Sequence, residues 1–164
     1  MSRLLRADYF INAVEHIDLD SWWTEGVRGL ILDVDDTLTR KNSPYLTPAV
    51  QSWLLQAKAK GFLCYLVSNN ASPEHIERIA QRLDIPAIAR ARKPRRSGFM
   101  WAIQDSGLPP HALVAIGDRV LTDILGGRRL GLRTCLVKPV TKRLTRRKRL
   151  LYAFEDRLSQ WLPL

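Results

Sequence analysis

Three acidic residues follow directly on an apolar run near the start of the sequence. Residues 29–32 read Gly-Leu-Ile-Leu, and Asp33, Asp35 and Asp36 come immediately afterwards. Such a run is typical of a buried strand, but a carboxylate is costly to move out of water. The strand therefore ends either at a solvated loop or beside a cation that the carboxylates hold.

These acids have the types and spacing needed to remove a phosphoryl group. Asp33 could attack phosphorus and form an acyl phosphate, which divides a difficult hydrolysis into two easier steps. Asp35 is two residues further on and could share a face of extended backbone with it, protonating the leaving oxygen and then deprotonating water. Mg²⁺ would let the anionic nucleophile approach an anionic phosphate, because it prefers oxygen ligands and substrate phosphates. Asp118 and Asp123 offer further carboxylates, and Lys93 offers a fixed positive charge for the phosphoryl oxygens.

Strand-like apolar runs alternate with helix-like segments along the chain. This pattern predicts an α/β fold, with a mostly parallel sheet flanked by helices. The predicted strands span residues 29–34, 62–70, 87–91, 112–117 and 133–137. The predicted helices span residues 48–60, 72–83, 96–107, 120–131 and a basic C-terminal segment, 141–164.

Polar residues follow each of the first four predicted strands. They are residues 33–37, residues 68–70, Lys93, and residues 117–118. The carboxyl ends of parallel strands share one edge of a sheet, and ligands bind in the crevice there. We therefore expect the four clusters to converge on one site.

The charge balance indicates a polyanionic partner. The chain of 164 residues has 26 Lys and Arg against 16 Asp and Glu, a formal net charge of +10. Nucleic acid, an anionic membrane surface or a phosphate-bearing substrate would each suit this charge. The length predicts one domain, residues 1–164, with its core at about 25–140.

Other features of the composition predict a cytoplasmic protein. Cys64 and Cys135 are too few for a secreted disulfide scaffold, so both are expected to be reduced core residues. No apolar run is long enough to span a bilayer. Arg3, Arg6 and Asp8 interrupt the start of the chain, which does not read as a secretory signal.

Four short motifs, in order, resemble those of the haloacid dehalogenase (HAD) superfamily, subfamily IIIA. They are DVDDT at 33–37, VSNN at 67–70, RKP at 92–94 and GDRVLTD at 117–123. A single D-x-D-x-T is a weak signal, whereas four ordered motifs at four strand ends are a strong one. The resemblance covers residues 29–137 and implies a Rossmann-like HAD core.

The resemblance also implies roles for individual residues. Asp33 would be the nucleophile and a Mg²⁺ ligand, and Asp35 the general acid/base, with its backbone carbonyl also reaching the metal. Asp118 would be the third protein ligand, and Asp123 would bind the metal directly or through water. The residues that would hold the phosphoryl group are Ser68, Asn69 and Lys93, and Thr37 would order the loop of the first motif.

The two usual positions for an inserted HAD cap are short here. Residues 38–67 and 71–92 are each mostly filled by one helix, so the chain is expected to be capless, with a site open to a bulky substrate. The segments before the first strand and around residues 117–131 are similar to the YqeG-like branch, which includes phosphatidylglycerophosphate phosphatases. Members of that branch more often carry Asn where Asp36 stands, outside the positions that react.

The resemblance implies a Mg²⁺-dependent phosphomonoesterase that releases phosphate from phosphatidylglycerophosphate, an anionic phospholipid, at the cytoplasmic membrane face. The basic run 138–149 and the helix-like segment after it could lie on an anionic leaflet, or that helix could pack on the sheet. One alternative is a soluble HAD phosphatase acting on a protein, nucleotide or sugar phosphate. Another is a nucleic-acid-binding protein with a vestigial site, which the intact acids disfavour.

Overall fold

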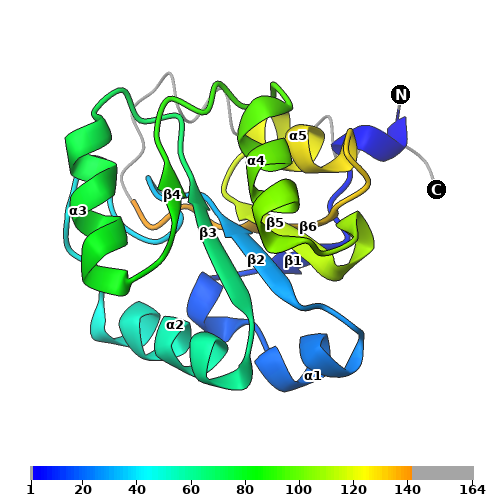
Figure 1. The fold of residues 1–164 in the computed structure, drawn as a ribbon, viewed down its shortest axis with the longest axis horizontal. Helices are drawn as coiled ribbons and strands as arrows, with labels where there is room; N and C mark the ends of the chain where they lie inside the picture. Colours follow the sequence, from blue (N-terminus) through cyan, green and yellow to red (C-terminus); the bar gives the residue numbers. More distant parts are fainter. Residues whose placement is uncertain (1, 142–164) are drawn as a thin grey trace.

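A six-stranded parallel sheet forms the centre of the molecule (Figure 1). The computed structural model describes residues 2–141. Its strands are β1 (Tyr9–Ile11), β2 (Gly29–Leu32), β3 (Leu63–Val67), β4 (Ala87–Ile88), β5 (Leu113–Gly117) and β6 (Arg133–Val137). They lie in the order β1-β6-β5-β2-β3-β4, and every neighbouring pair is parallel. The predicted α/β fold is confirmed.

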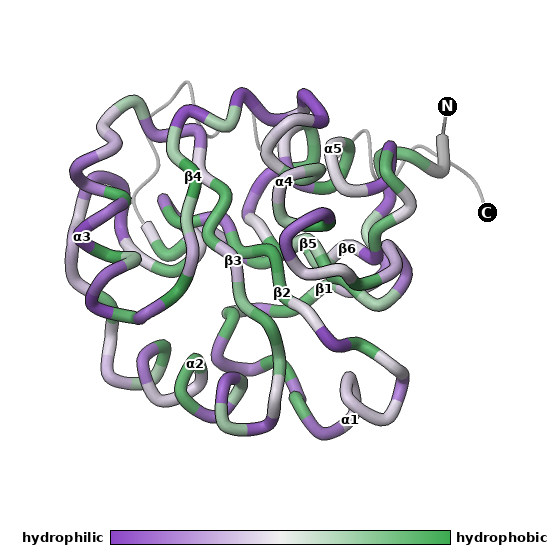
Figure 2. The backbone as a smooth tube through the Cα atoms, viewed as in Figure 1, coloured by the Kyte–Doolittle hydropathy of each residue, from purple (hydrophilic) through white to green (hydrophobic). Residues whose placement is uncertain are grey.

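Helices cover both faces of this sheet, which explains why its strands read as continuous apolar runs. Along β2, Leu30 and Leu32 pack on one face and Ile31 packs on the other. The first face is covered by α1 (Leu19–Thr24), α2 (Pro48–Lys60) and α3 (Pro73–Leu83). The second is covered by α4 (Ser97–Ser106), with α5 (Leu125–Arg128) beside it. Figure 2 shows the central strands as the hydrophobic interior of the molecule.

The capping residues read from the sequence set the ends of α2. The Thr47 hydroxyl accepts a hydrogen bond from the Val50 N–H, and Pro48 takes the first helical position. Gly61 ends the helix in the left-handed conformation, with φ of 99°. Both predicted helix boundaries are confirmed here.

The predicted short helix at 120–131 is present, but it is not one regular α-helix. The segment begins as a π-helical turn, η4 (Val120–Ile124), and continues as the short α5. Gly126 and Gly127 lie close to other elements: a Cβ on the first would meet the Phe99 ring at 2.4 Å, and one on the second would meet the Ala115 Cβ at 2.9 Å. The two glycines therefore let this helical segment pack closely against α4 and β5.

The core of the domain extends further toward the N-terminus than the expected range of about 25–140, because the first 25 residues also belong to it. β1 pairs with β6 at the edge of the sheet, and the segment also holds two 3₁₀ turns, η1 (Ser2–Leu5) and η2 (Val14–His16). Trp22 of α1 is 4% exposed and Trp53 of α2 donates its indole N–H to the Ile17 carbonyl, so the N-terminal segment is part of the core. A third 3₁₀ turn, η3 (Pro110–Ala112), precedes β5.

The sheet has a topological switch point between β2 and β5. From β2 the chain winds through β3 to β4 on one side, and from β5 it continues to β6 on the other side. In open α/β sheets a crevice forms where the winding reverses, outside the carboxyl ends of the strands. Between β2 and β4 the chain contains loops, α2, β3 and α3, so the described residues hold no inserted cap domain at this point of the fold. The predicted basic helix 141–164 lies outside the described residues, apart from residue 141.

Candidate active site

A pocket of about 460 Å³ lies at the carboxyl ends of β2, β3 and β5. It brings together seven of the eight predicted site residues: Asp33, Asp35, Ser68, Asn69, Lys93, Asp118 and Asp123. The eighth, Thr37, is 1% exposed and donates a hydrogen bond to Asp33 Oδ2 at 3.0 Å. The four polar clusters therefore converge as the strand order requires.

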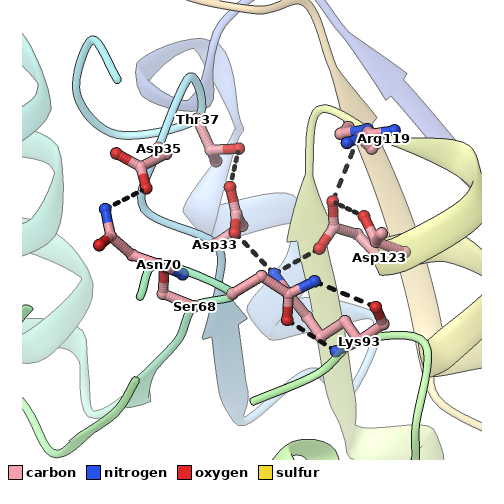
Figure 3. Close-up of polar contacts among 10 residues, drawn as sticks. Asp33, Asp35, Thr37, Ser68, Asn70, Lys93, Arg119 and Asp123 are labelled. Carbon is pink, nitrogen blue, oxygen red and sulfur yellow. Dashed lines mark hydrogen bonds and ion pairs between the residues drawn. The ribbon is translucent and has the colours of Figure 1, made fainter. Parts of the chain in front are cut away.

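Lys93 is the centre of a buried network of charges (Figure 3). Its ammonium lies 2.6 Å from Asp33 Oδ1 and 2.5 Å from Asp123 Oδ1. Burial disfavours the charge of Lys93, but Asp123 and Asp33 outweigh that effect and raise the pKa of the ammonium above its usual value. Lys93 is therefore charged at neutral pH and can offset the charge of groups that bind beside it.

Asp33 is positioned by the sheet as well as by its side-chain partners. Its N–H donates to the Ile116 carbonyl at 2.9 Å, which extends the pairing of β2 with β5 by one residue. Burial raises the pKa of the Asp33 carboxyl to about 6, although the charge of Lys93 lowers it. Asp33 is therefore mostly ionised at neutral pH, which is the state that its predicted role as a nucleophile requires.

Three of the acids have the arrangement of a metal site. Each of Asp33, Asp118 and Asp123 offers a carboxylate oxygen, these atoms lie within 4.8 Å of one another, and all three residues are buried. Carboxylate oxygens are the donors that hard cations such as Mg²⁺ prefer, so the donor set fits the expected metal. The Asp35 side chain belongs to a different group: its two oxygens accept hydrogen bonds from the Asn42 N–H at 2.8 Å and from the Asn70 side chain at 2.7 Å. The expected contact of the Asp35 carbonyl with the metal stays a prediction.

The residues expected to hold phosphate lie at the end of β3 and in the loop after β4. The buried Ser68 hydroxyl accepts a hydrogen bond from the Asn70 N–H at 3.1 Å. Asn69 brackets the backbone of Lys93, since its amide donates to the Lys93 carbonyl at 3.0 Å and its side-chain oxygen accepts from the Lys93 N–H at 2.6 Å. The structure thus gives Asn69 the task of fixing Lys93, while its contact with phosphate stays a prediction.

Asp123 depends on the glycine that ends β5. Its Oδ2 accepts hydrogen bonds from the Arg119 N–H at 3.2 Å and the Thr122 hydroxyl at 3.1 Å. A Cβ added to Gly117 would lie 2.3 Å from the Asp123 Cγ, well inside van der Waals contact. Only glycine at position 117 leaves room for this carboxylate against the strand.

Gly117→Ala is therefore expected to displace Asp123 and lower turnover by about 100-fold or more, with a loss of roughly 1–3 kcal/mol in the free energy of unfolding. Gly127→Ala is a matched control, because its Cβ would meet Ala115 at 2.9 Å and Thr134 at 3.0 Å, away from the acids. Turnover and urea unfolding should be measured for both variants. Equal losses of activity in the two would show that general overpacking, not the position of Asp123, is responsible.

The pocket also contains residues that were not predicted from the sequence, and most of them lie in loops. Lys41, Asn42, Asn70, Arg119 and Thr122 also line the pocket. Asn42 has a positive φ of 56°, a conformation in which Asn is enriched, but nothing in the sequence shows which loop residues will adopt it. Asn70 was visible within the VSNN motif, and its contact with Asp35 depends on how two loops meet.

Comparison with known proteins identifies the chain as a phosphatase of the HAD superfamily. The sequence model of the HAD-hydrolase-like family matches residues 90–152. Among solved structures, the cobalt-bound deoxy-D-mannose-octulosonate 8-phosphate phosphatase YrbI of Haemophilus influenzae has the same fold, with a TM-score of 0.57 at 15% identity over 69% of each chain.

The chain belongs to the YqeG-like phosphatases within this superfamily. It is 35% identical over 140 residues to the probable phosphatase YqeG of Bacillus subtilis, which covers 85% of this chain and 81% of that protein. It is 34% identical over 139 residues to the chloroplastic phosphatidylglycerophosphate phosphatase 1 of Chlamydomonas reinhardtii, covering 78% of this chain. The match spans 51% of that longer relative. The predicted membership is confirmed.

Proposed function

We propose that the protein is a Mg²⁺-dependent phosphomonoesterase that removes the terminal phosphate of phosphatidylglycerophosphate at the cytoplasmic face of an anionic membrane. The observation that carries the chemistry is the placement of Asp33. It is a buried carboxylate at the switch point of the sheet, 2.6 Å from a charged lysine and grouped with two further acids. The relative from Chlamydomonas, named for its action on this lipid, supports the substrate.

In the first step, a carboxylate oxygen of Asp33 attacks phosphorus, and the bond from phosphorus to the leaving oxygen breaks. The leaving oxygen takes a proton from the Asp35 carboxyl, giving the free alcohol and an aspartyl phosphate. In the second step, Asp35 takes a proton from water as the water oxygen attacks phosphorus. Inorganic phosphate leaves, and the Asp33 carboxylate is restored.

Asp33, Asp118 and Asp123 would hold Mg²⁺, with the Asp35 carbonyl as a further ligand. When bound, the metal supplies positive charge that offsets the charge of the phosphoryl group. Lys93 stays charged in the site and, with Ser68, would hold the phosphoryl oxygens while Asp33 attacks. Asn69 keeps Lys93 in place through its backbone.

Removal of the metal is therefore expected to silence the enzyme. Dialysis against EDTA should lower turnover to near the background rate, because three acids would then face an anionic substrate with Lys93 as the central buried cation. Added Mg²⁺ should restore turnover, and the metal-free protein should keep its far-ultraviolet circular dichroism. Full activity after metal removal, checked by elemental analysis, would contradict the assigned ligands.

Three features of the chain support a lipid substrate at a membrane. The described residues include no cap domain inserted between β2 and β4, so a headgroup could enter the pocket without leaving its bilayer. The formal net charge is +10, and three exposed arginines flank the buried Lys93, at positions 92, 95 and 96. Each basic residue near an anionic leaflet contributes about 1 kcal/mol to binding. The basic run within 142–149, which could add to this contact, lies outside the described residues, and none of the described helices has the length and apolar character needed to cross a bilayer.

The substrate is tested by measuring phosphate release, with Mg²⁺, from phosphatidylglycerophosphate vesicles and from a panel of soluble protein, nucleotide and sugar phosphates. We expect kcat/KM for the lipid to exceed that for every soluble ester by at least about tenfold. If a soluble ester were the best substrate, the proposed lipid substrate and membrane contact would be refuted, while the proposed roles of Asp33 and Asp35 would stand. The intact acid cluster argues against the remaining alternative, a nucleic-acid-binding protein with a vestigial site.

A further inference from the structure

Asp35, the proposed acid/base, is held at both carboxylate oxygens although it lies in a loop. It follows β2 by three residues, and the chain does not become regular again until α2 begins at Pro48. Oδ1 accepts a hydrogen bond from the Asn42 N–H at 2.8 Å, and Oδ2 accepts one from the Asn70 side-chain amide at 2.7 Å. Figure 3 shows Asn70 reaching across from the end of β3 to meet Asp35. Each oxygen keeps a further lone pair for a proton.

Asn70 is itself fixed in position by its neighbours. Its side-chain oxygen accepts a hydrogen bond from the Ser72 N–H at 2.8 Å. Because a backbone N–H can only donate, the oxygen must face Ser72 and the NH₂ group must face Asp35. The backbone of Asn70 is held as well, by a bond from its N–H to Ser68 Oγ at 3.1 Å and a bond to its carbonyl from the Arg90 N–H at 3.1 Å. Asn70 therefore presents its donor to Asp35 in one orientation.

The same NH₂ group links the two partners of Asp35. It also donates to the Asn42 side-chain oxygen at 3.2 Å, so Asp35, Asn42 and Asn70 form a closed triangle. The triangle joins the loop after β2 to the end of β3. These contacts define the direction of the Asp35 carboxyl in a segment that the sheet does not hold.

We infer that Asn70 is a positioning residue for the proposed acid/base, holding the Asp35 carboxyl where its proton can reach the leaving oxygen. The side-chain NH₂ of Asn70 can donate but cannot accept, so it cannot carry the proton itself. Its effect is to orient the Asp35 carboxyl. A general acid must lie within hydrogen-bond reach of the atom that it protonates, whatever its pKa. This inference rests on the proposed function, because it presupposes that Asp35 protonates the leaving group.

The leaving group gives a readout that a purely structural role would not change. An alkoxide is a poor leaving group and needs the proton from Asp35, whereas p-nitrophenolate departs readily without one. The aspartyl phosphate formed in the first step is the same for every ester, so only that step depends on the leaving group. The rate of alcohol release in a single turnover therefore isolates the contribution of the acid.

The test measures this rate for p-nitrophenyl phosphate and for phosphatidylglycerophosphate vesicles. Asn70→Ala removes the donor. Asn70→Asp keeps the size of the side chain and the acceptor for the Ser72 N–H but turns an oxygen toward Asp35, so it remains informative even if the alanine variant folds poorly. Asn69→Asp is the matched control, since it adds the same charge one residue away, where the side chain faces the backbone of Lys93. Asp35→Asn serves as the reference for complete loss of the acid.

We expect both Asn70 variants to slow alcohol release from the lipid by about 10- to 100-fold and release of p-nitrophenol by less than about threefold, with KM unchanged. Asn69→Asp should slow both substrates equally. If Asp35→Asn discriminates between the two esters and the Asn70 variants do not, Asn70 has no positioning role and the proposed function stands. If Asp35→Asn treats both esters alike, the acid role of Asp35 is wrong and the inference falls with it.

Discussion

Asp33→Asn is expected to lower phosphate release by at least about 10⁴-fold while the protein keeps its fold. The amide is nearly the same size as the carboxyl, and it can still accept the hydrogen bond from Thr37 and pair with Ile116 through its backbone. It cannot attack phosphorus as a carboxylate, so no aspartyl phosphate can form. Turnover with Mg²⁺ and far-ultraviolet circular dichroism check the two parts of this prediction.

The same substitution should change how stability depends on pH. The pKa of Asp33 in the folded protein is about 6, above the usual value of about 3.8 for an aspartic acid, mainly because of burial. The folded state therefore binds more protons than the unfolded state between about pH 4 and pH 6, and stability falls as the pH rises through this window. In metal-free protein, the free energy of unfolding of the wild type should fall by roughly 1–3 kcal/mol relative to that of Asp33→Asn as the pH rises from 4 to 6. Above this range the difference between the two proteins should level off.

Asp36→Asn is the matched control for this substitution, three residues along the same loop. Asp36 has a positive φ of 65°, which Asn adopts as readily as Asp, and it has no role in the proposed reaction. We expect its activity to stay within about threefold of the wild type. If Asp33→Asn were as active as this control, the assignment of Asp33 as the nucleophile would be refuted.

Lys93→Met should have the largest effect on stability. Removing the ammonium leaves Asp33 and Asp123 facing each other in a buried site, where an uncompensated charge costs about 3–5 kcal/mol. Activity should also fall by roughly 10²- to 10³-fold or more, since the phosphoryl oxygens lose a fixed positive partner. Urea unfolding of metal-free protein at neutral pH measures the first effect, and turnover with Mg²⁺ measures the second.

Lys60→Met makes the same change in an ion pair at the surface. Lys60 pairs with Asp20, whose side chain is 84% exposed, so this variant should lose less than about 1 kcal/mol. Adding Asp33→Asn to Lys93→Met should recover part of the lost stability, because it removes one of the two carboxylates left unpaired. If Lys93→Met were as stable as Lys60→Met at neutral pH, Lys93 would not offset the buried charges of Asp33 and Asp123 as we propose.

The acids and the sheet edge could be predicted from the sequence because both follow from local patterns. Asp33 follows an apolar strand, and Asp118 follows another, so the rule for parallel strands is enough to bring them together. The capping signals at Thr47 and Gly61 likewise depend on neighbouring residues alone. These predictions needed no knowledge of how distant parts of the chain meet.

The features that could not be predicted depend on tertiary contacts. β1 has three residues and pairs with β6 more than 120 positions later, so no local pattern marks it as a strand. The π-helical turn that carries Asp123 depends on space left by Gly117, which only the folded backbone defines. The hold of Asn70 on Asp35 depends on the approach of two loops. In each case the sequence contains the residues, and the fold determines which atoms face one another.

The covalent intermediate tests the central claim most directly. Enzyme mixed with substrate and Mg²⁺ would be quenched with acid within one turnover, reduced with borohydride and analysed by mass spectrometry of its peptides. We expect the aspartyl phosphate at Asp33 to be converted to homoserine at that position, and Asp33→Asn to show no such product. Turnover with no trapped product at Asp33, or with the phosphoryl group on a different residue, would contradict this claim.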